Sequence, residues 1–500
     1  MNITKITSMN KTVSIIATLV VVGMTSCKKD FITLNPESTV SLDVLYKTDK
    51  DFQDAVIGIY SNFRPQYLNF WRFGDLRGDD TRFGLVSQLE DARNDNFTSD
   101  NSDQVLASTW RNYYSIISRA NRVINIIEKA DVASVTNKNR HQGEAKFLRA
   151  LAYFDLVRIF GDVPLITSDV TILGAYKTSR EKVRTVYDEI IIKDLLDAET
   201  KLPLKYTGND IGRATRGAAK SLLGKVYVEL KDFAKAEAKL QEVTTLSYAL
   251  LPNFNDLWDY SKDEHHSEYI FDIEYEEGLG GLGSNFTGQF ALDFQGGGGP
   301  LVAELVRRYN IPSGTGGDAG TPNQSIFDAY SASPGDKRQE ISAAKGIVGP
   351  TGTLIPIAAT GVPGLTLKYM ARLVGSASDS KVNWKVIRYA DVLLMLAEAL
   401  NENGKTQLAL TSLNLVRTRA GVPIYSGLSQ TDTREKIYLE RRLELYMEGH
   451  RWFDLVRTGR ALSVMAPYGM KDYMTVFPIP QGQIDIVNDP AVFPQNRGYN

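Results

Sequence analysis

The sequence contains a single cysteine and only four histidines in 500 residues, and these shortages exclude several kinds of site. With Cys27 as the one cysteine, no disulfide can form within the chain, although exported proteins often carry such bonds. No Gly-x-Ser-x-Gly, His-Glu-x-x-His or phosphate-loop pattern occurs. His265, His266 and Glu268 form the one grouping that suggests a metal, but adjacent side chains on a helix or strand point apart. We therefore expect no metal, no cofactor and no catalytic residue.

The chain also lacks a surplus of charge and a long apolar run. Its 57 basic and 59 acidic residues give a net charge of −2, whereas nucleic-acid binding requires a basic surplus that displaces counterions. No apolar stretch reaches the roughly 20 residues that a membrane-spanning helix needs. Tyrosine outnumbers tryptophan by 24 to 5, which favours hydroxyl-rich ligands, because a phenol ring stacks on a sugar face while its hydroxyl forms hydrogen bonds. We expect no nucleic-acid partner.

The first 26 residues have the features of a bacterial lipoprotein signal peptide. Lys11 supplies positive charge, and an apolar run follows from Val13 to Met24, too short to cross a bilayer. The run ends in small residues before Cys27, which resembles the lipobox whose cysteine is acylated. A stray cysteine in an ordinary signal peptide is the alternative, and translation can start at Met1 or at Met9. We expect lipidation at Cys27, and an outer-membrane anchor.

Helix-turn-helix patterns recur in the mature chain. Residues 221–236 fit one helix, a short turn and a second helix, with Gly224 where the two helices of a tetratricopeptide repeat approach closely. Similar helical periodicity, with a turn near Gly449 in the last case, is found in residues 144–161, 393–415 and 441–460. These patterns predict a mainly α fold with helical repeats at about residues 40–64, 105–253 and 385–465.

Two long insertions separate the predicted repeats, at about residues 65–104 and 254–384. The second is rich in glycine and has one alternating, strand-like stretch at residues 269–275. Because ligand sites often lie in loops on a rigid scaffold, we expect the repeats to be the scaffold and the insertions the functional face. Residues 27–500 are expected to form a single unit of this kind.

Several motifs, in order along the chain, resemble those of the SusD/RagB family of nutrient-binding outer-membrane lipoproteins. They are Trp110-x-x-Tyr113-x-x-Ile116, Glu144-Ala145 with Arg149-Ala150, Phe160-Gly-Asp-Val-Pro-Leu165, Arg388-Tyr-Ala-Asp-Val-Leu-Leu-Met395, Glu440-Arg441-Arg442, Arg451-Trp-Phe-Asp-Leu455 and Phe477-Pro-Ile-Pro480. The resemblance covers nearly all of the mature chain. Arg497 departs from it, since the family often has proline there.

The resemblance implies a right-handed bundle of four repeat pairs supporting a variable, loop-rich half. It also implies a TonB-dependent, SusC-like barrel as partner, an oligosaccharide as ligand and no enzymatic activity. The charged motif residues are expected to tie repeat helices together rather than to form a site; they are Arg388, Asp391, Glu398, Glu440, Arg441, Glu444 and Arg451. Trp110 and Trp452 are expected in the core.

Ligand contacts are therefore expected in the insertions, and residues 71–83 are the best candidate. This stretch interleaves rings that can stack on sugars with charged side chains that can bind hydroxyls. Its candidate residues are Trp71, Phe73, Arg77, Asp79, Asp80, Arg82 and Phe83. A solvated, salt-bridged turn is the alternative. Phe286, Phe290 and Phe294 either add a second aromatic wall or hold their own loop in place.

Three functions remain open at this stage. A surface protein that binds glycans and delivers them to a barrel is the first, and the same architecture binding peptides is the second. The third is a surface hydrolase or a purely structural lid, because two carboxylates of a glycosidase can hide among 59 acidic residues. The identity of the glycan and the presence of a calcium ion are not determined by the sequence.

Overall fold

A computed structural model describes residues 46–84, 89–129, 134–168, 170, 172–262, 265–292, 299–311, 316–357 and 362–499. The predicted signal peptide, Cys27 and Phe294 lie outside these residues, so those predictions stay predictions. Within the described ranges, no helix is both long and apolar enough to cross a membrane.

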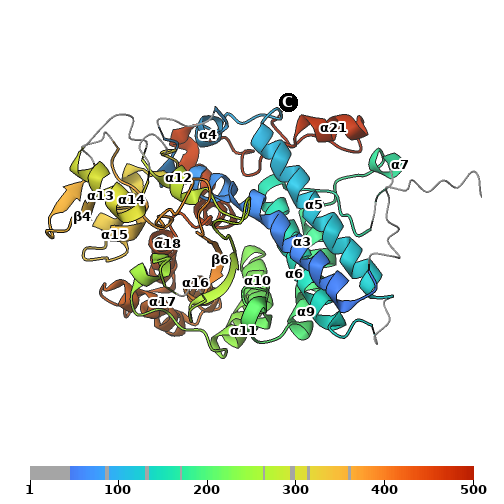
Figure 1. The fold of residues 1–500 in the computed structure, drawn as a ribbon, viewed down its shortest axis with the longest axis horizontal. Coiled ribbons are helices and arrows are strands. Elements are labelled where there is room, and N and C mark those ends of the chain that lie inside the picture. Colours follow the sequence, from blue (N-terminus) through green and yellow to red (C-terminus); the bar gives the residue numbers. More distant parts are fainter. Residues whose placement is uncertain are drawn as a thin grey trace, which may run out of the picture.

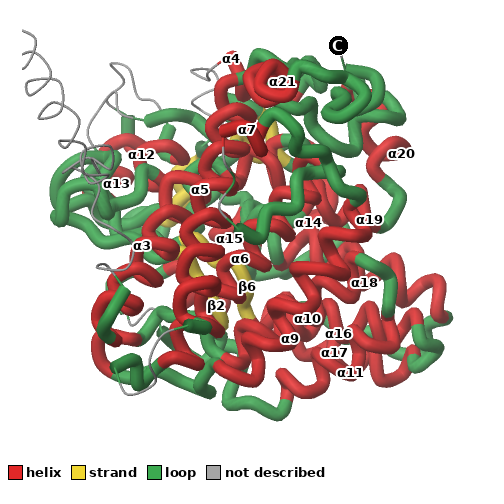
Figure 2. Tube along the Cα trace, turned by 90° about the vertical axis from the view of Figure 1, so that its right-hand side faces the viewer, coloured by secondary structure: helices red, strands yellow, loops and turns green. Residues whose placement is uncertain are grey.

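The chain is mainly helical, as expected from its periodicity (Figures 1 and 2). The longer helices are α3 (Asp49–Tyr67), α5 (Gln104–Ile127), α6 (Lys138–Phe160), α9 (Ile192–Lys201), α10 (Arg216–Glu229), α11 (Phe233–Thr244), α13 (Pro300–Tyr309), α16 (Tyr389–Glu402), α17 (Thr406–Ala420) and α18 (Gln430–Glu444). The shorter ones are α4 (Leu89–Asp95), α7 (Ile172–Ala175), α8 (Val183–Val186), α12 (Phe286–Phe290), α14 (Gln324–Ser331), α15 (Gln339–Ser342), α19 (Arg451–Arg457), α20 (Ala461–Met465) and α21 (Gln481–Val487).

The long helices pack in chain order. Helix α5 lies between α3 and α6, α6 contacts α9, α9 contacts α10, and the series continues through α11 and α16 to α17 and α18. Figure 1 shows this series running from α5 and α6 on the right to α17 and α18 on the lower left. The predicted helix pairs α10–α11 and α16–α17 are present, and the predicted turn near Gly449 separates α18 from α19. The arrangement is consistent with the repeat scaffold expected from the sequence.

Local sequence signals explain where several of these helices begin. Thr48 and Asp51 form a reciprocal capping box at the start of α3. The side chain of Asp103 accepts hydrogen bonds from the first backbone N–H groups of α5, and Thr215 does the same for α10. Each cap satisfies donors that the helix itself leaves unpaired.

Glycine allows α10 and α11 to approach closely, as the repeat pattern predicts. A Cβ added to Gly224 of α10 would lie 2.5 Å from Cδ2 of Leu240 on α11, well inside van der Waals contact. Tyr227 and Ala236 are buried in the same pair. The close contact between the two helices therefore depends on the missing side chain at Gly224.

The insertions form their own small structures beside the scaffold. Three two-stranded antiparallel sheets occur in the described residues: β1 (Thr81–Arg82) with β3 (Thr321–Pro322), β2 (Tyr269–Ile273) with β6 (Trp384–Arg388), and β4 (Gly346–Val348) with β5 (Leu354–Pro356). The expected strand at residues 269–275 is thus largely present. Helices α12 to α15 and strand β4 gather at the left of Figure 1. A second hydrophobic cluster, including Leu292, Leu305 and Leu373, stabilises this region apart from the main core.

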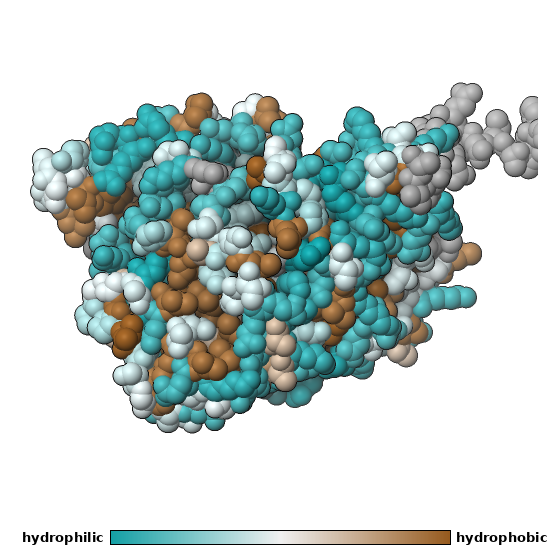
Figure 3. Space-filling model, turned by 90° about the horizontal axis from the view of Figure 1, so that it is seen from below, coloured by the Kyte–Doolittle hydropathy of each residue, from teal (hydrophilic) through white to brown (hydrophobic). Residues whose placement is uncertain are grey.

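The underside of the molecule is mostly hydrophilic. Figure 3 shows hydrophobic side chains gathered left of centre, on the side where Figure 1 places α17. Helix α17 contributes exposed Leu408 and Leu415. Isolated exposed leucines are ordinary on helical surfaces, so this face does not by itself define a site.

Candidate functional site

The predicted ligand loop at residues 71–83 is mostly buried. Trp71 is 0% exposed, and Phe73, Arg77, Asp79 and Asp80 are buried too. Residues 72–76 of this stretch form a π-helix, which packs against α19. The 71–83 stretch is therefore not a fully solvated turn, and its aromatic rings do not form a freely exposed surface. Direct ligand contact by its residues stays a prediction.

The rings of this loop, and the Arg77 guanidinium, pack against other core aromatics. Trp71 meets Phe290 edge-on with centroids 5.6 Å apart, and Phe73 meets Phe477 in the same way at 5.3 Å. The Arg77 guanidinium lies 4.2 Å from the ring centroid of Phe477. Burial lowers the pKa of Arg77 to about 10, so the side chain stays charged at neutral pH. These contacts give the loop a structural role in the core.

The acidic residues of the loop form ion pairs with the C-terminal helices. Asp79 accepts from Nε of Arg451 at 2.7 Å, and Asp80 accepts from Nε of Arg442 at 2.9 Å. Asp75 accepts from the backbone N–H of Gly449 at 2.8 Å. Burial raises the pKa of Asp79, but the two guanidinium groups lower it further, so the net shift is downward. The loop is therefore locked to α18 and α19 by charge.

Arg82 and Phe83 are the members of the loop that reach the surface. Arg82 is exposed and Phe83 half-buried, at the strand pair in which β1 of the first insertion meets β3 of the second. The backbone N–H of Phe83 donates to Asp95 at 3.3 Å, and burial raises the pKa of that carboxyl to about 6. A cation, a ring and a partly protonated carboxyl thus meet where both insertions join. This group of three residues is the surface candidate that remains from the predicted loop.

The second predicted aromatic wall lies mainly in the interior. Phe286 and Phe290 are 0% exposed and stack on each other with centroids 6.0 Å apart. Phe286 also contacts Tyr369 and Trp384. Of the two alternatives for these phenylalanines, the packing supports the one in which they hold their own loop in place.

The charged motif residues tie helices together, as predicted. Arg388 pairs with Glu448 at 2.6 Å and with Glu268 at 2.9 Å, and both partners are buried. Arg441 of α18 pairs with Asp391 of α16 at 2.8 Å. The remaining charged residues of the motifs make similar pairs, and they are Glu398, Glu440, Glu444 and Arg451. Trp110 and Trp452 are buried in the core, as predicted.

His265 and Glu268, two of the three residues that suggested a metal in the sequence, have different partners. His265 Nε2 lies 2.8 Å from Glu274, whereas the Glu268 carboxylate accepts from Arg388 and Arg419. In the described part of the chain, no group of three or more histidine, cysteine, aspartate or glutamate residues is arranged to hold a metal.

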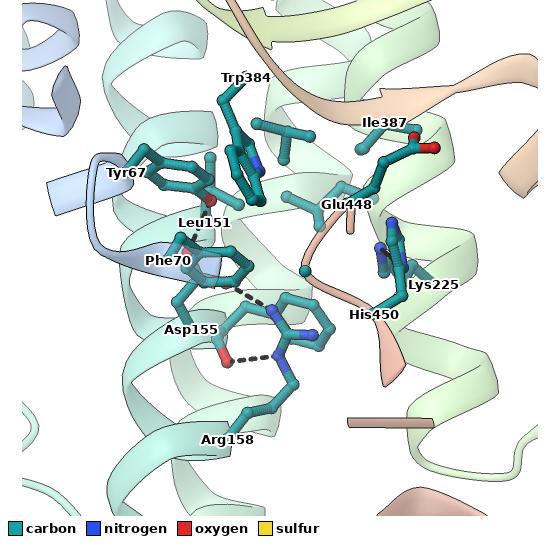
Figure 4. A pocket seen from close by; sticks show the side chains of 14 residues that line it. Tyr67, Phe70, Leu151, Asp155, Arg158, Lys225, Trp384, Ile387, Glu448 and His450 are labelled. Carbon is teal, nitrogen blue, oxygen red and sulfur yellow. Dashed lines mark hydrogen bonds and ion pairs between the residues drawn. The ribbon is translucent and has the colours of Figure 1, made fainter. Parts of the chain in front are cut away.

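A small internal cavity lies between α6, α10 and the turn at Gly449. Its volume of about 20 Å³ accommodates about one water molecule. Figure 4 shows Asp155, Arg158, Lys225 and His450 around it, with Asp155 accepting from the hydroxyl of Tyr67 at 2.7 Å. Burial, helped by the charge of Lys225, lowers the pKa of His450 to about 3. This cavity is part of the core and is too small for a nutrient.

Two larger cavities open to the surface on the helical scaffold. One, of about 590 Å³, is bordered by Tyr206, Tyr248 and Tyr269. The other, of about 460 Å³, lies beside α5 and is bordered by Trp110, Ile166 and Phe493. No local pattern in the sequence marks either cavity, because their walls come from segments far apart in the chain. The excess of tyrosine was the one available signal for the first.

The fold defines a class: mainly helical scaffold proteins in which long insertions form small structures beside the packed helices. The family model described as "SusD family" matches residues 364–499, and that described as "Starch-binding associating with outer membrane" matches residues 43–228. The chain belongs to the SusD/RagB family.

Individual relatives match over most of their length. SusD-like protein P2 of Formosa agariphila is 28% identical over 93% of this chain and 95% of its own. Starch-binding protein SusD of Bacteroides thetaiotaomicron is 24% identical over 72% of this chain and 73% of its own. A solved structure of a laminarin-binding SusD-like protein is 27% identical, with a TM-score of 0.75 over 91% of this chain and 100% of that one.

Proposed function

We propose that the protein is a surface-exposed lipoprotein of the outer membrane that binds oligosaccharides and passes them to a TonB-dependent, SusC-like barrel. The similarity to the laminarin-binding relative, over 91% of the chain at 27% identity, is the observation that carries this proposal. The starch-binding relative and the outer-membrane association in the description of the matching family model also support it. Acylation of Cys27 supplies the anchor, and the role is binding without turnover.

The proposed ligand surface lies where the two insertions meet. Arg82 provides a charged hydrogen-bonding group, Asp95 provides a carboxyl that can donate or accept hydrogen bonds, and the half-buried ring of Phe83 provides an apolar face. Each hydrogen bond to a sugar hydroxyl replaces one to water and contributes only about 0.5–1.5 kcal/mol, so affinity for the isolated protein is expected to be modest. A barrel beneath the bound ligand would slow release of the ligand without adding contacts on this surface.

Calorimetric titration of the purified chain with neutral oligosaccharides and with peptides tests this function. We expect one glycan class to bind and the double variant Arg82→Ala, Phe83→Ala to lose it with an unchanged thermal midpoint. The matched control is Arg184→Ala with Tyr176→Ala, which removes a guanidinium group and an aromatic ring from an exposed surface elsewhere. Binding of peptides alone would move the function to the peptide alternative, and product formation from a bound glycan would establish a hydrolase.

Delivery to the barrel requires a separate measurement. We expect glycan to bind more tightly when the lipoprotein and the barrel are reconstituted together than when the lipoprotein is alone. Equal affinity in both preparations would argue against a lid that retains ligand over the barrel.

A further inference from the structure

The cavity of about 590 Å³ on the scaffold is built by three segments that are separate in the sequence. They are the connection from α9 to α10, the end of α11 with the residues after it, and the segment entering β2. Its volume lies within the range of about 300–1,000 Å³ that is usual for small-molecule sites. None of its lining residues belongs to the 71–83 loop or to the surface around Asp95. It is therefore a different location from the surface proposed above.

Three tyrosine side chains on the wall of this cavity are held rigidly by the scaffold. The hydroxyl of Tyr206 donates to Glu144 at 3.3 Å, and that of Tyr269 donates to the carbonyl of Gly212 at 3.1 Å. The hydroxyl of Tyr248 lies 3.3 Å from the hydroxyl of Thr215. Because hydrogen bonds already fix each phenol, binding a ligand against these rings costs little side-chain entropy.

Two glycines maintain the shape of the cavity. A Cβ at Gly217 would lie 2.1 Å from the hydroxyl oxygen of Tyr248, so only glycine lets that ring pack against α10. Gly212 has φ of +97°, and a Cβ there would meet the carboxylate of Glu274 at 2.3 Å. The positions of Tyr248 and Glu274 thus depend on residues without side chains.

Two of the basic groups along the wall, Arg213 and His265, are already paired with carboxylates, whereas Lys205 is exposed at the cavity. Arg213 pairs with Glu144 at 3.2 Å and with Asp210 at 3.0 Å. His265 lies 2.8 Å from Glu274. An anionic ligand would have to compete with these carboxylates for Arg213 and His265, so this part of the wall favours a neutral ligand.

The remaining wall combines apolar and hydroxyl-bearing groups. Leu204 and Ile211 are 57% and 42% exposed and add apolar surface to the cavity beside the tyrosine rings. Thr215 and Ser267 contribute hydroxyls on the same wall. A purely apolar ligand would strip water from these hydroxyls without replacing its hydrogen bonds. A ligand with both apolar ring faces and hydroxyl edges satisfies the two kinds of surface at once.

We propose that this cavity is a second saccharide site, which binds neutral hexose oligosaccharides through the rings of Tyr206, Tyr248 and Tyr269. The proposal takes its ligand class partly from the proposed function, but it concerns a separate site. Two sites on one chain raise the time that a long glycan stays bound, because release from one site leaves the other occupied.

Methyl NMR of the full chain locates binding directly, because Ile211 and Ile270 both line the cavity. The probes are laminarihexaose, maltohexaose, cellohexaose and mannohexaose, with an oligogalacturonate as the anionic comparison. We expect at least one neutral hexaose to shift both isoleucine methyl signals, and the oligogalacturonate to shift them at least tenfold more weakly. Unmoved signals with all four neutral hexaoses, or a stronger response to the anionic probe, would overturn the proposal.

A pair of matched variants tests whether the cavity itself is occupied. Thr245 borders it, and Thr411 on α17 does not; both are exposed, and the hydroxyl of each donates to a helical carbonyl of its own helix. Thr245→Trp fills the cavity and should weaken the methyl response at least tenfold, whereas Thr411→Trp should leave it unchanged. Equal responses in the two variants would place the ligand elsewhere.

The double variant Arg82→Ala, Phe83→Ala separates this proposal from the proposed function. If the methyl response persists in that variant while calorimetry shows one site lost, both sites exist. A methyl response with no calorimetric loss supports the cavity and rejects the loop surface. Loss of the methyl response in the double variant rejects the cavity as an independent site.

Discussion

Asp79 and Arg451 lie 372 positions apart in the sequence and form a doubly hydrogen-bonded ion pair, with Nε to Oδ1 at 2.7 Å and Nη2 to Oδ2 at 3.0 Å. Both side chains are about nine-tenths buried. The pair joins the first insertion to the motif that identifies the C-terminal helices. The loop predicted to bind ligand is therefore attached to the most recognisable part of the scaffold.

Removing the carboxylate of this pair should strongly destabilise the fold. In Asp79→Ala, the largely buried guanidinium groups of Arg442 and Arg451 lose one of the two carboxylates that face them. Because Asp80 remains within 3.3 Å of Arg451, we expect a cost near the lower end of the about 3–5 kcal/mol that breaking a buried ion pair typically incurs. The matched control is Asp54→Ala, whose carboxylate makes only an exposed pair with Lys50. Denaturant unfolding of both variants checks the difference. Similar unfolding free energies for the two would show that the buried pair is not a structural lock.

Trp71→Ala should lose stability before it loses ligand. The side chain is fully buried against Phe290, so its removal leaves a cavity that costs about 3–5 kcal/mol. Calorimetric binding at a temperature where the variant is folded should match the wild type. A variant with a normal thermal midpoint and no binding would instead restore Trp71 as a ligand contact.

Two helical glycines should respond in opposite ways to alanine. Gly224→Ala places a methyl group against Leu240 and should cost about 1–3 kcal/mol through overpacking. Gly58→Ala on α3 meets nothing closer than 3.8 Å and should stabilise by up to about 1 kcal/mol, because alanine favours helix. Thermal unfolding of the two variants tests this. A stabilising effect at Gly224 would mean that α10 and α11 can separate without cost.

Asp95 should make stability fall as pH rises. Its pKa is about 6 in the folded chain against 3.8 as the reference, so between these values the folded state holds a proton that the unfolded state has released. Stability from this group is present below about pH 4 and is lost as pH rises through about 6, by up to about 3 kcal/mol. The free energy of unfolding of Asp95→Asn should therefore be higher than that of the wild type at pH 7.5 and equal to it near pH 4. An equal gain at both pH values would contradict a buried, protonated carboxyl.

Cys27 should carry the membrane anchor. Cys27→Ser should abolish incorporation of labelled palmitate in the native host and release the protein from the membrane fraction, since the acyl chains provide the binding energy. Ser26→Ala, which keeps a small residue before the cysteine, should change neither result. Membrane retention of the serine variant would require another means of attachment.

The sequence by itself determined the class of fold and the main scaffold. The scaffold is formed by contacts between helices that are neighbours in the sequence. Repeating apolar positions, the turn near Gly449 and small residues such as Gly224 are local patterns, and such patterns predict contacts of this kind. The structural role of the charged motif residues was also predictable, because their helical spacings allow ion pairs between side chains. The family likeness rests on the same ordered motifs.

Only the tertiary structure decided which predicted site residues are accessible. Trp71, Phe73 and Arg77 look like ligand residues in the sequence, since rings and charges side by side suit both a sugar site and a buried cation–π cluster. The second alternative holds because Phe477 and Phe97 pack against the Arg77 guanidinium. No local sequence pattern predicts these long-range contacts. The tyrosine cavity is an extreme case, because Tyr206, Tyr248 and Tyr269 become neighbours only when α9, α11 and β2 are packed together. Burial is a property of the assembled chain, and it determined both the interior position of Phe286 and Phe290 and the appearance of the new cavity.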